Sequence, residues 1–395
     1  MREITELLNK QVAQLKPSGI RKFFDIAEKM DNVISLGVGE PDFQTPWHIR
    51  EAGIRSLEQG RTRYTGNRGT VELRKEISNF MQRKYNLCYN AENEILVTVG
   101  GSEAIDGCIR AIVSPGDEVL IPEPSFVCYT PLTQMAGGVP VIIPTKNENN
   151  FRLTADELRE KITPKTKLLI LPYPNNPTGA VMRRKDLEEI AEVIRDTDIL
   201  VLSDEIYSEL TYGNERHTSI AEIEGMKERT VIINGFSKTY SMTGWRMGFA
   251  CGPTPILDLM TKIHQFGIMS APTTSQYAAV EALKNGDEDI ADMREEYDVR
   301  RKYIVNAFRK MGLDCFEPEG AFYVFPCIKS TGMDSNTFCE KLLISKQVAV
   351  VPGSAFGESG EGFIRISYCN SLKHLQQAVS KIKEFIDELN LEGTK

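Results

Sequence analysis

Short apolar runs recur along the chain, and stretches with helical spacing separate most of them. The runs lie at residues 95–99, 118–122, 139–143, 168–171, 199–202, 231–233 and 248–252. Runs of this length that end at Gly, Pro, Asn or Asp are typical of buried strands, whereas an apolar residue at every third or fourth position indicates an amphipathic helix. The alternation of the two patterns predicts an α/β fold with a mostly parallel sheet.

The two ends of the chain show other patterns. Residues 1–30 have helical spacing with a break at 18–21, and residues 33–43 are predicted to run as a strand into a Gly-Pro turn. Further on, we expect an extended segment at 265–276, a long helix at 276–311, and short strands within 320–326, 348–357 and 362–369. With 395 residues the chain exceeds the usual size of a single core. We therefore predict an N-terminal arm with part of the small domain at 1–45, a large domain at 46–290 and a small C-terminal domain at 291–395.

Composition narrows the classes of function. The net charge is -8, and no apolar run approaches the roughly 18 residues of a membrane-spanning helix. The N-terminus lacks the apolar core of a signal peptide, so we expect a cytoplasmic protein without a membrane partner. Without a basic arm, nucleic acid is not an expected partner. The eight cysteines form no C-x-x-C pair and none of the four histidines has a histidine four residues on, so neither disulfides nor a metal site are expected.

Candidate reactive residues are most concentrated between the last two apolar runs. Residues 230–252 read TVIINGFSKTYSMTGWRMGFACG and contain Ser237, Lys238 and Arg246 just after a strand end. Lys238 stands among apolar and aromatic residues such as Phe236 and Tyr240, and burial among them disfavours its ammonium form. Since a free amine can form an imine with a carbonyl compound, Lys238 is the candidate nucleophile.

Two further strand ends carry residues suited to an ionic ligand. Gly100, Gly101 and Ser102 separate a strand from a helix, and small residues at a helix start leave N–H groups free to bind a phosphate. Asp204 follows the apolar run at 199–202, at the sheet edge where parallel sheets bind their ligands. A carboxylate buried there needs a cationic or hydrogen-bonding partner.

The pattern S-K-x-x-x-x-x-G-W-R-x-G at residues 237–248 resembles the lysine signature of the class I/II aminotransferases, which are pyridoxal phosphate (PLP) enzymes of fold type I. N-N-P-T-G at residues 175–179 and the order of the other motifs extend the resemblance over nearly the entire chain. The resemblance implies a large domain with a mostly parallel seven-stranded sheet flanked by helices, and a smaller α+β domain. It also implies transamination between an L-amino acid and a 2-oxo acid, with pyridoxal 5'-phosphate as cofactor.

The resemblance assigns a role to each motif. Lys238 is expected to hold PLP as a Schiff base and to act as the catalytic base, Asp204 to keep the pyridine nitrogen protonated, and Tyr207 to contact the phenolic oxygen. The other implied cofactor contacts are Gly101, Ser102 and Arg246 at the phosphate, with Ser237, Asn176 and the stacking ring of Phe126. Taken singly, several of these residues have an ordinary alternative role as a turn former, a core aromatic or a surface residue.

Substrate binding and assembly are also implied by the resemblance. Arg365 is expected to bind the substrate α-carboxylate through a bidentate fork, together with Asn176 and the backbone of Gly39. Tyr64 lies in a polar loop whose tyrosine, in the family, crosses a dimer interface and binds the PLP phosphate of the partner subunit. A homodimer with active sites at the interface is therefore expected.

Two departures from the family pattern bear on phosphate binding and on the substrate. Gly235 stands where many relatives have a second phosphate-binding serine. Residues 264–276 contain no arginine, whereas the best-known aspartate aminotransferases bind the second carboxylate of the substrate with an arginine from this segment. Phe126, Phe322 and Ile20 are expected to offer apolar contact instead. We therefore expect glutamate or 2-oxoglutarate as one partner and a second substrate bulkier than aspartate.

Several substrates and two other functions stay open. The bacterial subgroup with the most similar motifs includes N-acetyl-LL-2,6-diaminopimelate, aromatic and aspartate aminotransferases. A carbon-sulfur β-lyase on the same scaffold is the alternative reaction. A non-catalytic PLP sensor fused to a transcription regulator would need a basic helix-turn-helix domain, of which residues 1–30 show no trace.

Overall fold

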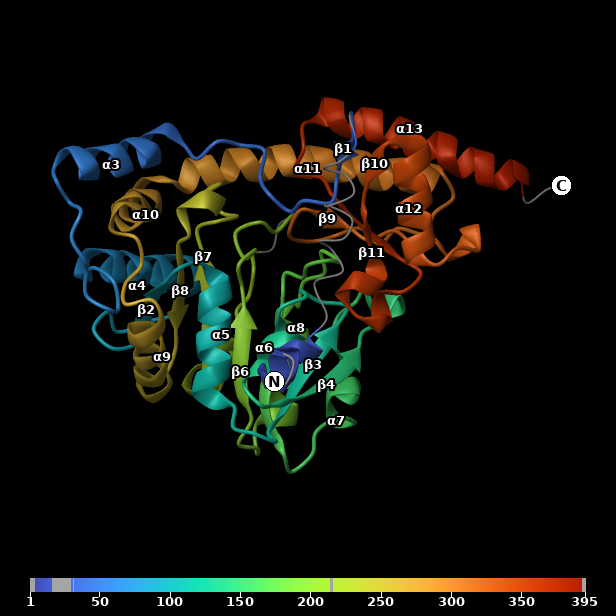
Figure 1. Cartoon of the computed structure of the whole chain (residues 1–395). Coiled ribbons are helices and arrows are strands. Elements are labelled where there is room, and N and C mark those ends of the chain that lie inside the picture. The colour runs from blue at the N-terminus through green and yellow to red at the C-terminus, as the bar shows by residue number, and fades with distance from the viewer. Residues whose placement is uncertain (1–3, 16–29, 31, 214–215, 393–395) are drawn as a thin grey trace.

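Three β-sheets and a set of flanking helices make up the computed structural model, which describes residues 4–15, 30, 32–213 and 216–392 (Figure 1). The strands are β1 (Ile34–Ser35), β2 (Ile95–Thr98), β3 (Glu118–Glu123), β4 (Val139–Pro144), β5 (Thr166–Leu171), β6 (Leu200–Asp204), β7 (Thr230–Gly235), β8 (Gly248–Cys251), β9 (Tyr323–Val324), β10 (Val348–Ala349), β11 (Val351–Pro352) and β12 (Ile364–Ser367). The α-helices are α1 (Lys10–Gln14), α3 (Trp47–Glu58), α4 (Val71–Tyr85), α5 (Gly101–Ile112), α6 (Tyr129–Met135), α7 (Ala155–Arg159), α8 (Arg184–Ile194), α9 (Thr254–Gly267), α10 (Thr273–Asn285), α11 (Asp287–Lys310), α12 (Ser335–Lys346) and α13 (Leu372–Glu392).

The largest sheet has seven strands in the order β2-β8-β7-β6-β5-β3-β4. β8 runs antiparallel to both of its neighbours, and the other pairs in this sheet are parallel. Figure 1 shows helices flanking the sheet. The seven predicted apolar runs correspond to its seven strands, so the predicted α/β fold with a mostly parallel seven-stranded sheet is confirmed.

Helices cover both faces of this sheet. In β2, Leu96 packs in the same apolar cluster as Ile105 of α5, whereas Ile95 and Val97 pack in the same cluster as Ile77 of α4. Because successive residues of a strand face opposite sides, burial of every position requires helices on both faces. This double burial explains why the strands read as continuous apolar runs.

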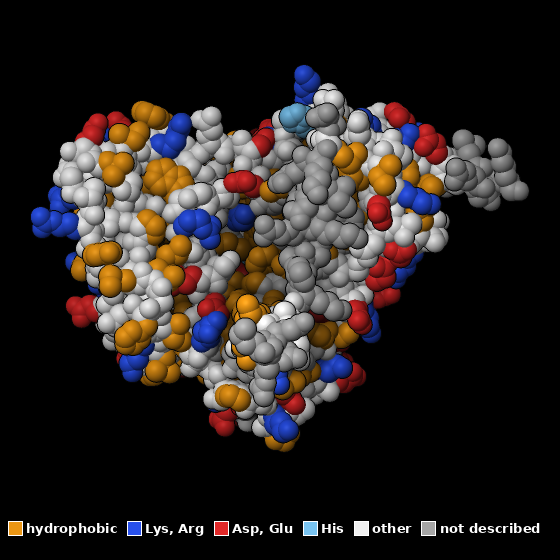
Figure 2. All heavy atoms as spheres, in the orientation of Figure 1, with side chains coloured by type: hydrophobic (Ala, Val, Ile, Leu, Met, Phe, Trp, Pro, Cys, Tyr) orange, Lys and Arg blue, Asp and Glu red, His pale blue; other side chains and the backbone are white. Residues whose placement is uncertain are grey.

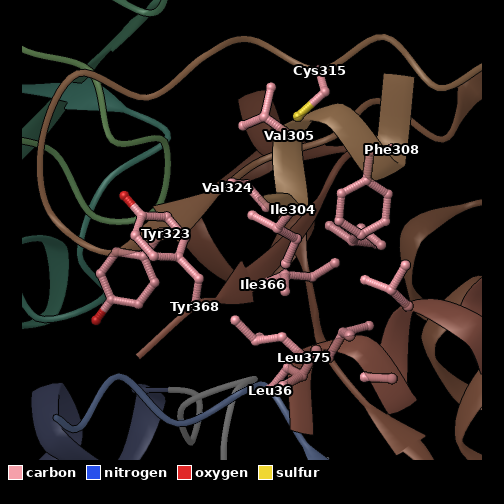
Figure 3. Packing of buried hydrophobic residues seen from close by; sticks show 14 of the residues in the cluster. Leu36, Ile304, Val305, Phe308, Cys315, Tyr323, Val324, Ile366, Tyr368 and Leu375 are labelled. Atoms are coloured by element: carbon pink, nitrogen blue, oxygen red, sulfur yellow. The ribbon is translucent and has the colours of Figure 1, made fainter. Parts of the chain in front are cut away.

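The C-terminal part of the chain forms two smaller sheets. β11, β12 and β9 are antiparallel neighbours, and β1 pairs in parallel with β10. The β1–β10 pairing joins the N-terminal segment to the C-terminal part. Figure 3 shows the core between these strands and the helices, where Leu36 packs in one cluster with Phe308 of α11 and Ile366 of β12. The smaller α+β part implied by the resemblance is present.

Three predicted elements differ from the structure in extent. The strand expected at 33–43 is the two-residue β1, because the Gly- and Pro-rich residues that follow leave the pairing with β10. The extended segment expected at 265–276 is the end of α9, a short turn and the start of α10, whose N-cap is Pro272. The helix expected at 276–311 is divided into α10 and α11 at Gly286, which ends α10.

Some predictions about the chain ends and the domains stay untested. Ile20 and the break at 18–21 lie outside the described residues. The division into 1–45, 46–290 and 291–395 stays a prediction, and α11 runs through its second boundary. In the part of the chain that the structure describes, we find no helix that is both long and apolar enough to span a membrane.

Candidate active site

The predicted site residues converge on one cavity of about 310 Å³, a volume in the range of small-molecule sites. Those that line it are Gly39, Gly101, Ser102, Phe126, Asn176, Asp204, Tyr207, Ser237, Lys238, Arg246 and Arg365. Several of them follow the parallel strands β5, β6 and β7. The carboxyl ends of parallel strands meet at one edge of a sheet, which brings together segments that are far apart in the sequence.

Lys238 presents an amine to this cavity from the turn after β7. Its Nζ donates a hydrogen bond to the carbonyl oxygen of Gly39 at 2.6 Å and lies 5.9 Å from the ring centre of Phe322. Burial lowers the pKa of Lys238 from 10.5 to about 8. A part of the amine is therefore unprotonated near neutral pH, as attack on a carbonyl group requires.

Asp204 supplies a buried carboxylate at the end of β6, with 6% of its surface exposed. Its Oδ2 accepts a hydrogen bond from the Tyr129 hydroxyl at 2.6 Å, and its Oδ1 accepts one from the N–H of Ile206 at 3.3 Å. Burial raises the pKa of Asp204 to about 6, against the effect of the hydrogen bond from Tyr129. A protonated ring nitrogen in the cavity would supply the missing cationic partner.

Arg365 lies on β12 with 4% of its surface exposed. One Nη donates to Oδ1 of Asn176 at 3.0 Å, the other donates to the carbonyl oxygen of Gly37, and Nε has no partner among the described residues. The guanidinium carbon lies 4.6 Å from the ring centre of Tyr323 and 4.7 Å from that of Phe356. A buried guanidinium held in a fixed plane is suited to bind a carboxylate through two hydrogen bonds.

The N-terminus of α5 and Arg246 form a positively polarised corner of the cavity. Gly100 precedes the helix with φ +81°, and a Cβ on it would lie 2.5 Å from Nη2 of Arg246. The guanidinium therefore packs against the backbone next to the free N–H groups of the first helical turn, which contains Ser102. A cation beside a helix N-terminus favours binding of a phosphate. Ser237 is buried and also lines the cavity.

Several residues that line the cavity were not predicted, and two of them are tyrosines, Tyr129 and Tyr323. Tyr129 donates to Asp204, and the hydroxyl of Tyr323 lies 2.9 Å from that of Tyr207. The sequence offered a signal for each, because both stand in segments that were singled out for another aromatic residue, residues 124–129 and 320–326.

The predicted contact of Phe322 with the substrate is wrong. Phe322 is fully buried in the core and does not line the cavity, whereas its neighbour Tyr323 does. Phe322 lies in the turn just before β9, and its ring packs against that of Tyr297 in the core, with 5.5 Å between the ring centres. Phe126, the other aromatic residue of that prediction, lines the cavity with its ring 6.1 Å from that of Tyr129.

Tyr64 lies outside the cavity and is 82% exposed. It lines a separate depression together with residues 61–63 and 270–274. The loop is fixed to that segment by hydrogen bonds from Asn67 Nδ2 to the carbonyl oxygen of Met269 at 2.8 Å and from Thr273 Oγ1 to that of Arg63 at 2.7 Å. A single chain does not bring Tyr64 to the other site residues, so its predicted role depends on a second chain.

The side chains around the cavity fit PLP. The corner at α5 and Arg246 suits a phosphate, the buried carboxylate of Asp204 suits a protonated ring nitrogen, and the amine of Lys238 suits an aldehyde. By contrast, the described ranges contain no group of three or more His, Cys, Asp or Glu side chains that could hold a metal ion.

Comparison with known proteins identifies the family. The family model for aminotransferase class I and II matches residues 31–382. YugH of Bacillus subtilis, whose name proposes an aminotransferase, is 53% identical over 383 residues, which cover 97% of this chain and 99% of YugH. The aspartate aminotransferase of Pyrococcus abyssi is 46% identical over 379 residues, covering 95% of this chain and 97% of that protein. A second Bacillus subtilis protein, whose name proposes N-acetyl-LL-diaminopimelate aminotransferase activity, is 43% identical over 380 residues, covering 96% of each chain.

Solved structures agree with this result. The aromatic aminotransferase of Pyrococcus horikoshii superimposes with a TM-score of 0.90 at 44% identity, covering 93% of this chain and 100% of that one. The chain therefore belongs to the class I and II aminotransferases. Enzymes of this family depend on PLP, and this protein is an aminotransferase.

Proposed function

We propose that the protein transfers an amino group between an L-amino acid and a 2-oxo acid, with glutamate or 2-oxoglutarate as one partner. The observation that carries the proposal is the meeting of an amine, a buried carboxylate and a buried guanidinium in one cavity, from Lys238, Asp204 and Arg365. A protein that only bound PLP would need contacts for the phosphate and the ring, but no further cationic group for a carboxylate. The buried guanidinium of Arg365 is suited to a further ligand group, the α-carboxylate of a substrate, which indicates an amino acid or oxo acid.

The residues that would hold the cofactor can be grouped by the part of PLP that they contact. Gly101, Ser102, Ser237 and Arg246 would bind the phosphate, Phe126 the ring face, Asp204 the ring nitrogen, and Asn176 and Tyr207 the phenolic oxygen. When bound, PLP supplies an electron sink that stabilises the negative charge left at the substrate Cα after loss of its proton.

Lys238 has two tasks in the proposed reaction, attachment of the cofactor and proton transfer. Its Nζ accepts the proton from the substrate Cα, which requires the free amine. A pKa of about 8 gives a usable fraction of free amine at neutral pH and keeps enough basicity to hold the proton. The carbonyl oxygen of Gly39, 2.6 Å from Nζ, orients the amine. Asp204 keeps a proton on the ring nitrogen through the charge of its carboxylate.

Arg365 orients the substrate. Its hydrogen bonds to Asn176 and Gly37 and its two aromatic neighbours hold the guanidinium in one plane. A guanidinium held in this way binds the α-carboxylate in one orientation, which restricts the positions open to the Cα proton. Lysine could not replace it, because an ammonium group does not fix the plane of a carboxylate.

We further propose a homodimer. Four residues with large apolar side chains are exposed: Tyr64 (82%), Phe266 (87%), Ile268 (44%) and Met269 (48%). We call these four residues the exposed apolar surface. Figure 2 shows further hydrophobic side chains over the left part of the view, where α3 and α9 lie. Apolar surface of this extent on a water-soluble enzyme is typical of an interface, and a second copy would bring its Tyr64 towards the cavity.

Replacement of the lysine tests the proposed reaction. We expect Lys238→Ala to bind PLP through the phosphate and ring contacts and to lose transaminase activity by about 1,000-fold or more in kcat, because the variant lacks the proton-transferring amine. Lys185→Ala, which alters an 85% exposed lysine of α8, serves as the control and should keep full activity. Near-normal transamination by Lys238→Ala would contradict the proposal.

The substrate range tests the nature of the second substrate. With 2-oxoglutarate as acceptor, kcat/KM is compared for aspartate, phenylalanine and N-acetyl-LL-2,6-diaminopimelate. We expect a bulkier donor to be preferred, because residues 264–276 contain no arginine that could bind the second carboxylate of aspartate. A preference for aspartate by about 100-fold, roughly 2.7 kcal/mol, would contradict this part of the proposal. Release of pyruvate, ammonia and a thiol from cystathionine, in place of amino transfer, would indicate the β-lyase reaction.

A further inference from the structure

A buried tyrosine, Tyr323, connects three parts of the active site. It lies on β9 with 2% of its surface exposed and lines the cavity. Its hydroxyl is 2.9 Å from that of Tyr207, which follows β6 of the large sheet. Its ring centre is 4.6 Å from the guanidinium carbon of Arg365 on β12. A Cβ added to Gly39 of the N-terminal segment would lie 1.9 Å from its hydroxyl oxygen.

The two tyrosine hydroxyls form a single hydrogen bond in which either can donate. Each hydroxyl has one proton, and this is the only hydrogen bond of either group among the described residues. If Tyr323 donates, the proton of Tyr207 is free to point into the cavity, which both side chains line. A hydroxyl that accepts a hydrogen bond also becomes a stronger donor. The direction of this bond therefore controls what Tyr207 can offer to a ligand.

The ring of Tyr323 has a separate effect on Arg365. The guanidinium contacts Tyr323 and Phe356 at similar distances, 4.6 and 4.7 Å, and has no carboxylate partner within the described ranges. Aromatic rings attract a cation that has been removed from water, and they limit the rotation of a planar group. The ring thus keeps the guanidinium in place before a substrate supplies its carboxylate.

We propose that Tyr323 is a positioning residue that acts through two neighbours. Its hydroxyl donates to Tyr207 and directs the proton of Tyr207 into the cavity, and its ring holds Arg365 ready for the substrate carboxylate. The inference rests on the proposed function, because that function assigns the cavity to PLP and an amino acid. A hydroxyl directed at the phenolic oxygen of the cofactor stabilises negative charge there. It therefore lowers the pH at which the bound chromophore loses its proton.

Tyr323→Phe tests the hydroxyl, since phenylalanine keeps the ring. In a pH titration of the absorption of the holoenzyme without substrate, we expect the midpoint to rise by roughly half a pH unit. Tyr207→Phe should raise it further, and the double variant should have the midpoint of Tyr207→Phe alone, because Tyr323 acts through Tyr207. An unchanged midpoint in Tyr323→Phe, or additive shifts in the double variant, would overturn this part of the inference.

Tyr368→Phe is the matched control. Tyr368 is a buried tyrosine of the same core cluster, its hydroxyl donates to the carbonyl oxygen of Ala321 at 3.1 Å, and it does not line the cavity (Figure 3). We expect its midpoint to equal that of the wild type. A shift as large as that of Tyr323→Phe would show that loss of any buried hydroxyl in this core has the same effect, and would overturn the inference.

Tyr323→Leu tests the ring. We expect the KM of every amino donor to rise about tenfold above that of Tyr323→Phe, with little further change in kcat, because Arg365 loses its aromatic support. Equal KM values for the two variants would overturn the part played by the ring. Absence of transamination by the wild type would instead overturn the proposed function. If the wild type is active and the titration midpoint of Tyr323→Phe is unchanged, only the role of the Tyr323 hydroxyl is contradicted, and the proposed function stands.

Discussion

At the scale of single residues, burial shifts the pKa of two titratable side chains that line the cavity, Lys238 and Asp204. The pKa of Lys238 falls to about 8 and that of Asp204 rises to about 6, so each is shifted towards its neutral form. Removal from water penalises the charged form of both groups. For Asp204, a protonated ring nitrogen would reverse the effect, because an opposite charge favours the carboxylate. We therefore expect the folded protein to be more stable with its cofactor bound than without it.

The raised pKa of Asp204 predicts a dependence of stability on pH. The pKa of about 6 in the folded protein exceeds the ordinary 3.8, so the folded state binds more protons between these values. The cofactor-free protein consequently loses stability as the pH rises through this window. We expect Asp204→Asn to stabilise the cofactor-free protein at pH 7 by roughly 1 to 3 kcal/mol, and to have little effect below about pH 4. Chemical denaturation at the two pH values measures this difference.

The same substitution should have the opposite consequence for catalysis. Asparagine cannot keep the ring nitrogen protonated, so we expect kcat of the holoenzyme to fall by about 100-fold or more. Asp156→Asn, at a 90% exposed side chain of α7, is the control and should change neither stability nor rate appreciably. A cofactor-free Asp204→Asn protein that is less stable than the wild type at pH 7 would contradict the raised pKa.

At the scale of secondary structure elements, the large sheet could be predicted from the sequence and the smaller sheets only in part. Most of the seven strands are buried on both faces and therefore leave continuous apolar runs, whereas the edge strand β4 is only partly buried. β1 has two residues whose partners on β10 are far away in the sequence, Ile34 with Val348 and Ser35 with Ala349. A local pattern holds no information about such a partner, so the predicted strand was too long.

The candidate site could likewise be predicted where it depends on local motifs, and not where it depends on contacts between distant segments. The motifs identified most of the residues that line the cavity, because each motif is local and lies at a strand end or a helix start. Tyr129 and Tyr323 were missed because what they do depends on contacts across elements, to Asp204 and Tyr207. The sequence could show that an aromatic residue stands there, but not which atom it reaches.

The helix α5 gives a prediction about phosphate binding. Gly100→Ala would put a Cβ 2.5 Å from Nη2 of Arg246, so the guanidinium must move away from the helix N-terminus. We expect the dissociation constant of PLP to rise about tenfold, because the phosphate loses a charge-assisted contact. Gly116→Ala is a matched control, since Gly116 also has a positive φ, +91°, but no atom within 4 Å of the added Cβ.

Both alanine variants should lose similar stability through backbone strain, and only Gly100→Ala should lose affinity for PLP. Thermal unfolding of the cofactor-free proteins measures the first effect, and titration with PLP measures the second. Equal affinities of the two variants would contradict the close packing of Arg246 on the helix start as the basis of phosphate binding.

At the scale of the whole molecule, the cavity depends on segments from the entire chain. Asp204 ends strand β6 and Lys238 follows strand β7 of the large sheet, and Arg365 lies on the smaller antiparallel sheet. Gly39 comes from the N-terminal segment that β1 fixes to β10. The carbonyl of Gly39 accepts from Lys238, and that of Gly37 accepts from Arg365. The N-terminal segment therefore joins the cofactor side of the cavity to the substrate side. Among the described residues that were predicted to bind the cofactor or the substrate carboxylate, Tyr64 is the one that does not line the cavity.

The exposed apolar surface explains how Tyr64 can still take part, if a second copy of the chain covers it. Phe266→Asp tests this directly, because its side chain is 87% exposed and a charge there is harmless in a monomer. In a dimer the same charge would be buried without a partner, which disfavours association. We expect sedimentation velocity to show a dimer for the wild type and a shift towards monomer for Phe266→Asp, with a parallel loss of transaminase activity.

The matched control is Ile344→Asp, at a 66% exposed side chain of α12, which should stay dimeric and active. A fully active monomeric wild type would contradict both the homodimer and the proposed role of Tyr64.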